Sequence, residues 1–232
     1  MENTNVIIDV KNLTKIFKMD KEKIVAINDI SFQICEGEIC CLFGKSGCGK
    51  STLLNLLSGI EKTTSGVIKI NNYRIDKMSE KKLAKFRQKY LSFIFQSYNL
   101  LPQFTAIENV ELPLVFKGVN KKVRQKKAIE MLKHVDLGER LEHRPSQMSG
   151  GQQQRVGIAR AFVSSPKIIF ADEPTGNLDT KTTDKIMQLI LNMSKEKKLT
   201  VVMVTHDASL LKYADKIINM EDGKITGITT KN

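Results

Sequence analysis

The sequence has no apolar run long enough to cross a membrane. Its longest apolar runs, such as Val201–Val204, are far shorter than the roughly 20 residues that a transmembrane helix needs. The first residues, MENTNVIIDV, lack the basic and apolar regions of a signal peptide. We therefore expect a soluble, cytosolic chain. If it serves a membrane process, the spanning part should lie on another chain.

Cysteine is scarce and clustered. The four cysteines are Cys35, Cys40, Cys41 and Cys48. They lie around one strand and one loop, no CxxC pair occurs, and the three histidines are far apart in sequence. This pattern argues against a disulfide framework and against a zinc site. We expect reduced, buried thiols, which fits a reducing compartment.

Acidic residues are fewer than basic ones, 25 against 37, and the net charge is +12. Basic chains attract nucleic acid, anionic lipid or phosphorylated ligands. Here the lysines are spread over predicted helices, and no basic run is interleaved with aromatic residues that stack on bases. We therefore expect no nucleic-acid partner. A solvated lysine-rich surface and proximity to an anionic membrane both remain open.

The chain has 232 residues, and 41% of them are apolar, which is an ordinary composition for a globular protein. This is enough for one large domain or two small ones with a proper core. Short β-like runs continue to about Ile34, and Val67–Ile75 reads as further β structure. Between them, the apolar run Ile39–Phe43 leads into a glycine-rich loop and a helical pattern at Ser51–Ser58. The order strand, glycine loop, helix predicts a phosphate site in an α/β fold.

The middle of the chain has the apolar spacing of helices instead of strands. Apolar residues recur at helical spacing from Ser79 to about Val163, apart from Tyr98–Pro113, which reads as a loop. The strand-like runs Ile168–Ala171 and Thr200–Val204 then flank an amphipathic helix at Thr182–Lys195. Short apolar strands separated by helices predict a parallel sheet that is covered on both faces.

The glycine-rich loop matches the pattern GxxxxGK[ST]. Its residues are Gly44, Lys45, Ser46, Gly47, Cys48, Gly49, Lys50, Ser51 and Thr52. The glycines let successive backbone N–H groups point at phosphates, and the helix start adds positive potential. We predict that Lys50 reaches the β- and γ-phosphates and that the Ser51 hydroxyl binds Mg²⁺. The loop alone does not separate ATPases from GTPases or kinases.

The apolar strand from Ile168 ends in two carboxylates, Asp172 and Glu173. An acid at this kind of strand end holds Mg²⁺ in phosphoryl-transfer enzymes. We predict that Asp172 holds the metal through water and that Glu173 polarises the attacking water. A strand that merely ends in a solvated turn is the alternative, and this pattern would be weak evidence on its own.

A third motif, Met148–Arg155, lies between the first two and reads MSGGQQQR. It resembles the signature motif of the ATP-binding-cassette (ABC) family. Ser149 and the glycines would open a predicted helix, Gln152–Val163, whose start presents free N–H groups to an anion. The resemblance implies that this second phosphate-binding helix start serves the γ-phosphate of a partner subunit. The residues concerned are Ser149, Gly150, Gly151 and Gln152.

Further positions match the same family. Gln96 resembles the glutamine that senses Mg²⁺ and the attacking water, Asp179 the loop that crosses the dimer interface, and His206 the histidine that contacts the γ-phosphate. Phe17 stands where the family places an aromatic that stacks on adenine, although a core residue is also possible there. Two departures are visible: Met148 replaces the usual leucine, and Phe17 the more frequent tyrosine. Both replacements are similar in character.

The resemblance covers essentially the whole chain and implies an α/β fold. This is a P-loop NTPase core with a mostly parallel sheet, an N-terminal antiparallel β subdomain and a helical insertion. We expect one ABC ATPase domain, in which residues 1–78 and 164–232 form the core with its β subdomain and residues 79–163 form the helical subdomain.

The function implied is that of an ATP-hydrolysing subunit that forms a homodimer around two Mg-ATP. Tyr98–Phe104 and Glu108–Leu114 resemble the lipoprotein-release, macrolide-export and antimicrobial-peptide-export branch, where this stretch receives a membrane permease. A permease would then dock near Tyr98–Phe116, placing the chain on the cytoplasmic face of the membrane. The apolar residues that could line the docking groove, or could pack the insertion's own core, are Leu100, Leu101, Phe104 and Phe116.

Two functional classes stay open at this stage. One is transport, with export or extraction of a peptide, lipoprotein or drug. The other is a non-transporting complex that uses the same ATPase to regulate a cell-envelope process. A soluble ABC ATPase of DNA repair or translation usually carries a long coiled-coil insertion or two tandem cassettes, and the sequence shows neither.

Overall fold

The computed structural model describes residues 5–19 and 22–231. The chain packs as two compact units, the first made of residues 1–87 and 198–232 and the second of residues 88–197. The helical subdomain predicted for residues 79–163 lies mostly in the second unit, which also contains the acidic strand and the helix after it. We describe each unit by itself.

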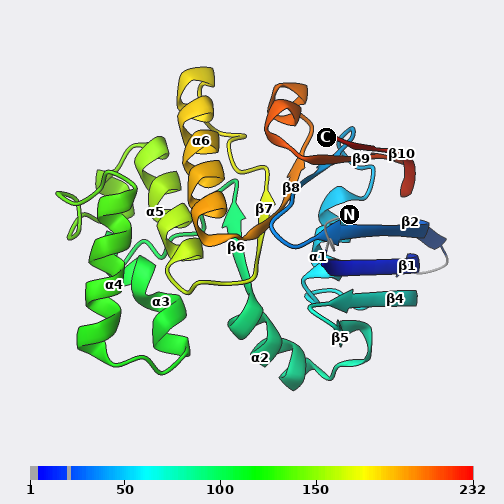
Figure 1. Ribbon diagram of the computed structural model, residues 1–232, viewed down its shortest axis with the longest axis horizontal. Coiled ribbons are helices and arrows are strands. Elements are labelled where there is room, and N and C mark those ends of the chain that lie inside the picture. Colours follow the sequence, from blue (N-terminus) through cyan, green and yellow to red (C-terminus); the bar gives the residue numbers. More distant parts are fainter. Residues whose placement is uncertain (1–4, 20–21, 232) are drawn as a thin grey trace. The chain divides into compact units, whose positions relative to one another are not determined.

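The first unit contains an antiparallel sheet with the strand order β2-β1-β4-β5. Its strands are β1 (Val6–Met19), β2 (Glu22–Cys35), β4 (Ser65–Ile70) and β5 (Tyr73–Arg74). The predicted β run at residues 67–75 is thus a hairpin, which turns at Asn71 and Asn72 with φ of 47° and 65°. Asparagine tolerates this left-handed conformation, which two-residue hairpin turns require. The predicted antiparallel β subdomain is confirmed (Figure 1).

The first unit also contains a mixed group of strands in the order β10-β9-β3-β8. They are β3 (Ile39–Phe43), β8 (Thr200–Thr205), β9 (Lys216–Glu221) and β10 (Lys224–Thr230). β3 pairs in parallel with both β8 and β9, and every residue of β8 is buried. Burial from both sides explains why these two strands read as continuous apolar runs.

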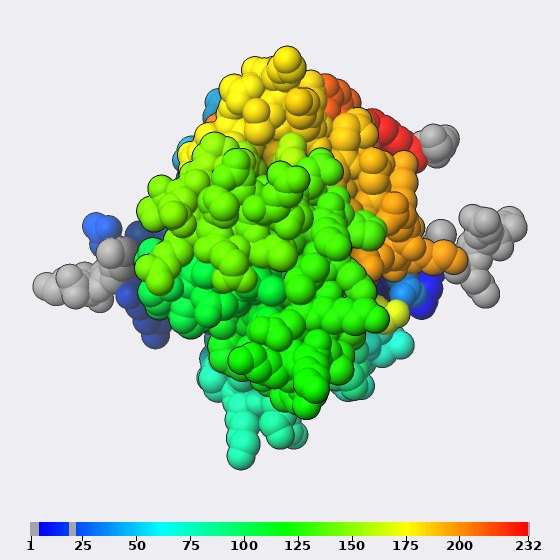
Figure 2. Space-filling model, turned by 90° about the vertical axis from the view of Figure 1, so that its left-hand side faces the viewer, coloured from blue at the N-terminus to red at the C-terminus, as the bar shows by residue number. Residues whose placement is uncertain are grey.

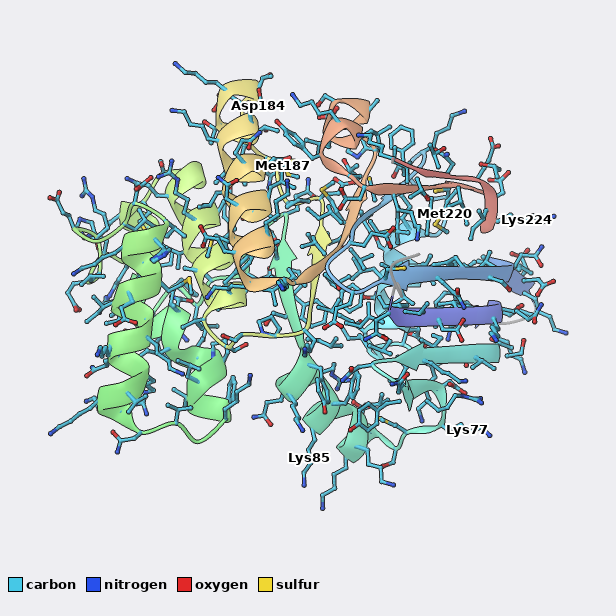
Figure 3. All side chains as sticks on the ribbon, viewed as in Figure 1. Lys77, Lys85, Asp184, Met187, Met220 and Lys224 are labelled. Carbon is cyan, nitrogen blue, oxygen red and sulfur yellow. The ribbon has the colours of Figure 1, made fainter. Side chains whose placement is uncertain are left out.

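Two helices and two short 3₁₀ turns complete the description of this part of the chain. They are α1 (Lys50–Leu57), α2 (Glu80–Tyr90), which continues into the second unit, and the turns η1 (Ile75–Lys77) and η3 (Ala208–Tyr213). α1 buries its four leucines, and α2 buries Leu83 and Phe86 at the predicted helical spacing. Lysines such as Lys77, Lys85 and Lys224 are exposed and point away from the ribbon (Figure 3). Much of the positive charge is therefore solvated.

The second unit combines two parallel strands with four helices. The strands are β6 (Leu91–Phe95) and β7 (Ile168–Asp172). The helices are α3 (Ala106–Phe116), α4 (Lys121–His134), α5 (Gly150–Phe162) and α6 (Thr180–Lys197), with the 3₁₀ turn η2 at Pro145–Gln147. α6 buries Ile186, Met187, Ile190 and Met193 at intervals of three and four residues, as its amphipathic pattern predicts. Figure 3 labels Met187 on this helix.

The loop that we predicted at Tyr98–Pro113 is wrong in its second half, because α3 begins at Ala106 and continues through Pro113. Proline inside a helix usually breaks it, because it lacks a backbone N–H and clashes with the preceding turn. A capping box outweighs it: the Thr105 hydroxyl accepts from the N–H of Glu108, and the Glu108 carboxylate accepts from the N–H of Thr105. The buried apolar face of Ile107, Val110 and Leu114 adds to this stability.

α4 lies at the surface of the second unit, on the face that Figure 2 turns toward the viewer, and its exposed side is basic. Its exposed lysines are Lys121, Lys122, Lys126, Lys127 and Lys133. Only Ala128 and Leu132 are buried on this helix, where they pack toward the rest of the unit. In the part of the chain that the structure describes, no helix is both long and apolar enough to cross a membrane.

Candidate nucleotide-binding site

The phosphate loop follows β3 and leads directly into α1. In the first unit, the Lys50 ammonium donates to the backbone carbonyls of Gly44 and Lys45, both at 2.7 Å. It also lies 3.8 Å from Sγ of Cys48, and Lys50 is 5% exposed. The loop thus curls around its own lysine. No acidic residue lies in the first turn of α1, so the positive end of the helix has no competing carboxylate there.

Two glycines make this curl possible. Gly49 caps α1 with a φ of 101°, a left-handed conformation that favours glycine. A Cβ at Gly49 would lie 2.5 Å from the carbonyl oxygen of Ala26, and one at Gly44 would lie 2.2 Å from that of Met220. Both distances are far below normal contact, so any larger residue would force the loop open. The loop predicted from the sequence is therefore confirmed in its shape.

Phe17 lies on β1 close to this loop. It pairs with Ile24 of β2, two residues before Ala26, whose carbonyl packs against Gly49. The ring is half-buried, and it is absent from the core of the unit. The structure thus brings the predicted adenine-stacking residue to the neighbourhood of the phosphate loop.

His206 reaches the same edge of the strands. Thr205, the last residue of β8, pairs in parallel with Phe43, the last residue of β3. The next residues are His206 and Gly44, so the histidine and the phosphate loop leave neighbouring strands at the same end. His206 is exposed. In open α/β sheets, ligands bind at this carboxyl end of parallel strands.

The second unit brings the other predicted acids and amides together in the same way. Phe95 of β6 pairs with Asp172 of β7, so Gln96 and Glu173 follow at the same edge of the strand pair. Glu173 has a φ of 45°, which is strained for a residue with a Cβ. Such strain clusters at functional sites, where it fixes the direction of a side chain.

Gln96 is fixed by the segment after Glu173. The side-chain amide of Asn177 donates to the carbonyl oxygen of Gln96 at 3.0 Å, and that of Gln96 donates to Oδ1 of Asn177 at 3.4 Å. Asp179 then caps α6, because its carboxylate accepts from the N–H of Thr182 at 3.0 Å. Hydrogen bonds from Thr182 lower the pKa of Asp179. The carboxylate therefore stays ionised at neutral pH.

The signature residues form the start of α5. Ser149 and Gln152 make a reciprocal capping box: Oγ of Ser149 accepts from the N–H of Gln152 at 3.4 Å, and the side chain of Gln152 accepts from the N–H of Ser149 at 3.0 Å. Gly150 and Gly151 occupy the first turn, whose N–H groups have no acceptor within the helix. As in α1, no acidic residue lies in that turn. The prediction of a helix here is confirmed, although it begins two residues earlier than expected.

Sequence reasoning missed several residues that hold these parts in place. Gln154 is fully buried, and its side-chain amide donates to the carbonyl oxygen of Pro174, just after the acidic pair. Arg160 donates to the carbonyl oxygens of Asn99 and Tyr98 at 2.6 and 2.8 Å. The glutamine run was visible in the sequence, but which glutamine points inward depends on packing.

Tyr98 lies along α5. Its carbonyl is held by Arg160 near the end of the helix, and a Cβ at Gly150 would lie 2.8 Å from its hydroxyl oxygen near the beginning. The same glycine position thus serves the helix start and leaves room for the tyrosine. Nothing in the spacing of the sequence indicated this contact.

The cysteines do not form a metal site or a disulfide. Cys40, Cys41 and Cys48 are buried, Cys35 is half-buried, and all four are free. Among the described residues, no group of three or more His, Cys, Asp or Glu side chains is placed to hold a metal ion. Mg²⁺ needs no such cluster in phosphoryl-transfer enzymes, because one or two protein groups and the substrate phosphates suffice.

These features are a phosphate loop curled by glycines around a buried lysine, and two helix starts without acidic residues. They define a nucleotide-binding α/β protein, and comparison with known proteins identifies its family. The family model described as ABC transporter matches residues 27–176. The chain belongs to this family, and it is an ATP-binding cassette that hydrolyses ATP.

Individual relatives cover nearly the full length. An uncharacterized ABC transporter ATP-binding protein of Methanocaldococcus jannaschii is 48% identical over 97% of this chain and 100% of its own. The lipoprotein-releasing system ATP-binding protein LolD of Pseudoalteromonas translucida is 41% identical over 96% of both chains. The solved dimer of the ATP-binding cassette MJ0796 in a post-hydrolysis state, bound to ADP and Pi, has a TM-score of 0.89 at 43% identity and covers 96% of this chain and 98% of that one. The predicted P-loop fold is confirmed.

Proposed function

We propose that two copies of this chain close around two ATP molecules, each held by the phosphate loop of one copy and the signature helix start of the other. The observation that carries the proposal is that α1 begins after a glycine-rich turn and α5 begins with two glycines, and that neither helix has an acid in its first turn. Each start offers N–H groups and positive potential to an anion. The dimeric, ADP- and Pi-bound structure of MJ0796 supports this arrangement.

The residues of each half have distinct proposed roles. Phe17 stacks on the adenine, and residues 44–52 wrap the phosphates with Lys50 at the β- and γ-phosphates. Ser149, Gly150, Gly151 and Gln152 bind the γ-phosphate of the opposite copy, and Asp179 lies at the dimer interface. His206 contacts the γ-phosphate. These roles rest on the match of each position to the family's motifs.

Mg²⁺ completes the proposed chemistry, and its ligands would be Ser51, Gln96 and Asp172. The metal neutralises charge on the phosphates when it is bound. Glu173 accepts a proton from the attacking water, in the direction that its strained backbone sets. Hard oxygen donors such as a hydroxyl, an amide oxygen and a carboxylate are what Mg²⁺ prefers.

ATP therefore favours the closed dimer, and hydrolysis removes the bridging contacts and opens it. The test is the Glu173→Gln variant, which keeps the shape of the side chain but cannot accept the proton. We expect it to hydrolyse ATP at a small fraction of the normal rate and to elute as a dimer with ATP, measured by size-exclusion chromatography with light scattering. A variant that binds ATP yet stays monomeric would contradict the proposal.

We further propose that this motion drives a membrane permease docked near Tyr98–Phe116, on the cytoplasmic face of the membrane. Phe116 is 70% exposed and Leu101 37% exposed, so neither packs in the core of the second unit. The likeness to LolD favours export or extraction of an amphiphilic substrate such as a lipoprotein, peptide or drug.

Docking is tested by co-purification with the permease expressed from the same cells. Phe116→Asp should abolish the association without changing the basal ATPase rate. Val25→Asp on β2, another exposed apolar position at 47%, serves as the control and should retain the permease. Equal binding by both variants would mean that the permease docks elsewhere.

A further inference from the structure

Lys15 of β1 is a buried lysine with three partners. It is 8% exposed, although lysine side chains are almost never buried unless they are paired. Its ammonium donates to Oε1 of Glu61 at 2.6 Å and to the carbonyl oxygen of Lys62 at 2.8 Å. It also lies 4.6 Å from the centroid of the Phe17 ring. The cation is therefore fixed by two acceptors while it covers one face of that ring.

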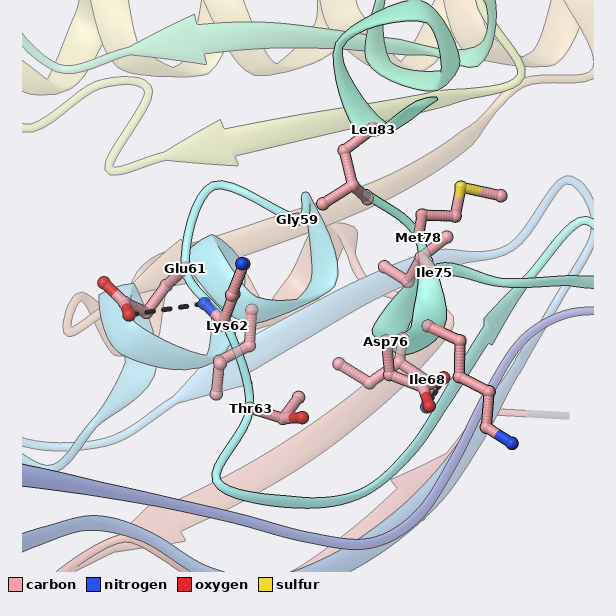
Figure 4. Close-up of a pocket in the computed structure, with 11 residues that line it drawn as sticks. Gly59, Glu61, Lys62, Thr63, Ile68, Ile75, Asp76, Met78 and Leu83 are labelled. Carbon is pink, nitrogen blue, oxygen red and sulfur yellow. Dashed lines mark hydrogen bonds between the residues drawn. The ribbon is translucent and has the colours of Figure 1, made fainter. Parts of the chain in front are cut away.

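Glu61 is itself held in place on the loop that follows α1. Its Oε1 accepts from the backbone N–H of Lys62 at 3.3 Å (Figure 4). The hydrogen bond from Lys15 lowers the pKa of Glu61, so the carboxylate is ionised at neutral pH. The pair thus ties β1 to the end of the phosphate-loop helix, all within the first unit.

The Phe17 ring keeps part of its surface open to a ligand, because it is only half-buried. Residues 15 and 17 are two apart on β1, and the contact of 4.6 Å between the ammonium and the ring centroid places both side chains on the same side of the sheet. The ammonium lies over one face of the ring, and we take its opposite face as the one that stacks on the base. A cation draws π-electron density toward itself, which reduces repulsion between the opposite face and an electron-rich base stacked on it.

We propose that Lys15 and Glu61 are positioning residues for adenine recognition, which hold and polarise the Phe17 ring. This inference rests on the proposed stacking of adenine on Phe17. A ring that is already fixed loses less conformational entropy when the base binds. Lys15 and Glu61 act on the base through the ring, and they leave the phosphates to the loop. Their loss therefore affects ligands that carry a base and spares ligands that do not.

The test uses the full chain and two probes, ATP and inorganic tripolyphosphate, with binding measured by calorimetry without Mg²⁺ so that hydrolysis does not interfere. Lys15→Met keeps the length and apolar character of the stem but removes the charge. We expect ATP binding to weaken roughly threefold to tenfold, because the ring that stacks on the base is then neither held nor polarised, and tripolyphosphate binding to stay unchanged. Lys15→Arg, which keeps a cation, should restore ATP binding, and Glu61→Gln should fall between Lys15→Met and the wild type.

Two controls separate the possible failures. Arg74→Met breaks another ion pair of the first unit, with Asp76 at 2.7 Å, and should leave both affinities unchanged. If Phe17→Ala does not weaken ATP binding, the proposed role of Phe17 is wrong. If Phe17→Ala weakens it but Lys15→Met does not, only the present inference is wrong. Equal weakening of both probes by Lys15→Met would show that Lys15 merely supports the fold, and would overturn the inference as well.

Discussion

The side-chain nitrogen of Gln96 lies 2.6 Å from the position that a Cβ on Gly176 would occupy. Gln96 follows β6 and Gly176 follows the acidic pair, so the absence of a side chain at 176 lets the glutamine lie against the catalytic segment. Cβ atoms essentially never approach another atom so closely. Gly176→Ala must therefore displace the Gln96 side chain.

We expect Gly176→Ala to lower the ATPase turnover number roughly tenfold to a hundredfold, because a small misplacement of a positioning group costs about that much. The affinity for ATP without Mg²⁺ should stay unchanged, since the phosphate loop is untouched. Steady-state ATPase assays and ATP titration measure the two effects. Gly227→Ala on β10, where the nearest atom would be 3.7 Å away, is the control and should keep normal turnover. Normal turnover in Gly176→Ala would show that Gln96 has no part in the reaction.

Lys50 supplies the second prediction. Lys50→Ala should weaken ATP binding at least tenfold, because a hydrogen bond to a charged group contributes about 1.5–3 kcal/mol. Titration with a fluorescent ATP analogue measures the loss. Lys224→Ala removes the same charge from an exposed site of the first unit (Figure 3) and should bind normally. Similar affinities for the two variants would rule out a direct contact between Lys50 and the nucleotide.

Asn109 gives a prediction about stability. It is fully buried on α3, and it exchanges hydrogen bonds with the loop before the helix: Oδ1 accepts from the N–H of Leu101, and Nδ2 donates to the carbonyls of Leu101, Phe104 and Thr105. Asn109→Ala should lower the free energy of unfolding by about 2 kcal/mol. Urea denaturation measures it.

The matched control for this change is Asn192→Ala at an exposed position of α6. Alanine has the higher helix propensity, so this variant should be as stable as the wild type or slightly more so. If the two variants unfold at the same urea concentration, the buried amide does not anchor the loop.

The buried thiol of Cys41 leads us to predict that the free energy of unfolding depends on pH. Burial raises the pKa of its thiol from 9.0 to about 12. Between these values the unfolded chain has lost the proton that the folded chain still holds, so rising pH favours unfolding. The stabilisation by the neutral thiol is full below about pH 9 and is lost as the pH approaches 12. Cys41→Val is similar in volume and does not titrate.

The measurement compares the free energies of unfolding of wild type and Cys41→Val at pH 8 and pH 11. All other groups titrate equally in both proteins, so the difference isolates this thiol. We expect the wild type to lose on the order of 1–3 kcal/mol more than the variant over this interval. Equal losses of unfolding free energy in the wild type and in Cys41→Val would mean that the thiol is not shielded from water.

The sequence predicts the parts of this site that depend on local chemistry. The loop at Gly44–Thr52 needs glycine at positions with left-handed backbone or no space, and those glycines are visible in the sequence. The strand ends at Phe43, Asp172 and Thr205 follow from short apolar runs. Their order along the chain, together with the motif at Met148–Arg155, was enough to indicate the family.

The residues that the sequence left unassigned act through tertiary contacts. Arg160, Gln154 and Asn109 look like ordinary polar residues of helices, and only packing shows that each one binds backbone carbonyls elsewhere in the unit. The wrong loop prediction for Tyr98–Pro113 has a similar origin. The unfavourable effect of Pro113 is outweighed by a capped helix start and a buried apolar face.

Tyr98 contacts α5 near both of its ends. The helix has 13 residues and is therefore roughly 20 Å long. Near its C-terminal end, Arg160 donates a hydrogen bond to the Tyr98 carbonyl, and the tyrosine hydroxyl lies against Gly150 at its N-terminal end. A displacement of the chain at Tyr98 would therefore disturb the contacts at the start of α5, which carries the signature glycines, and those near its end at the same time.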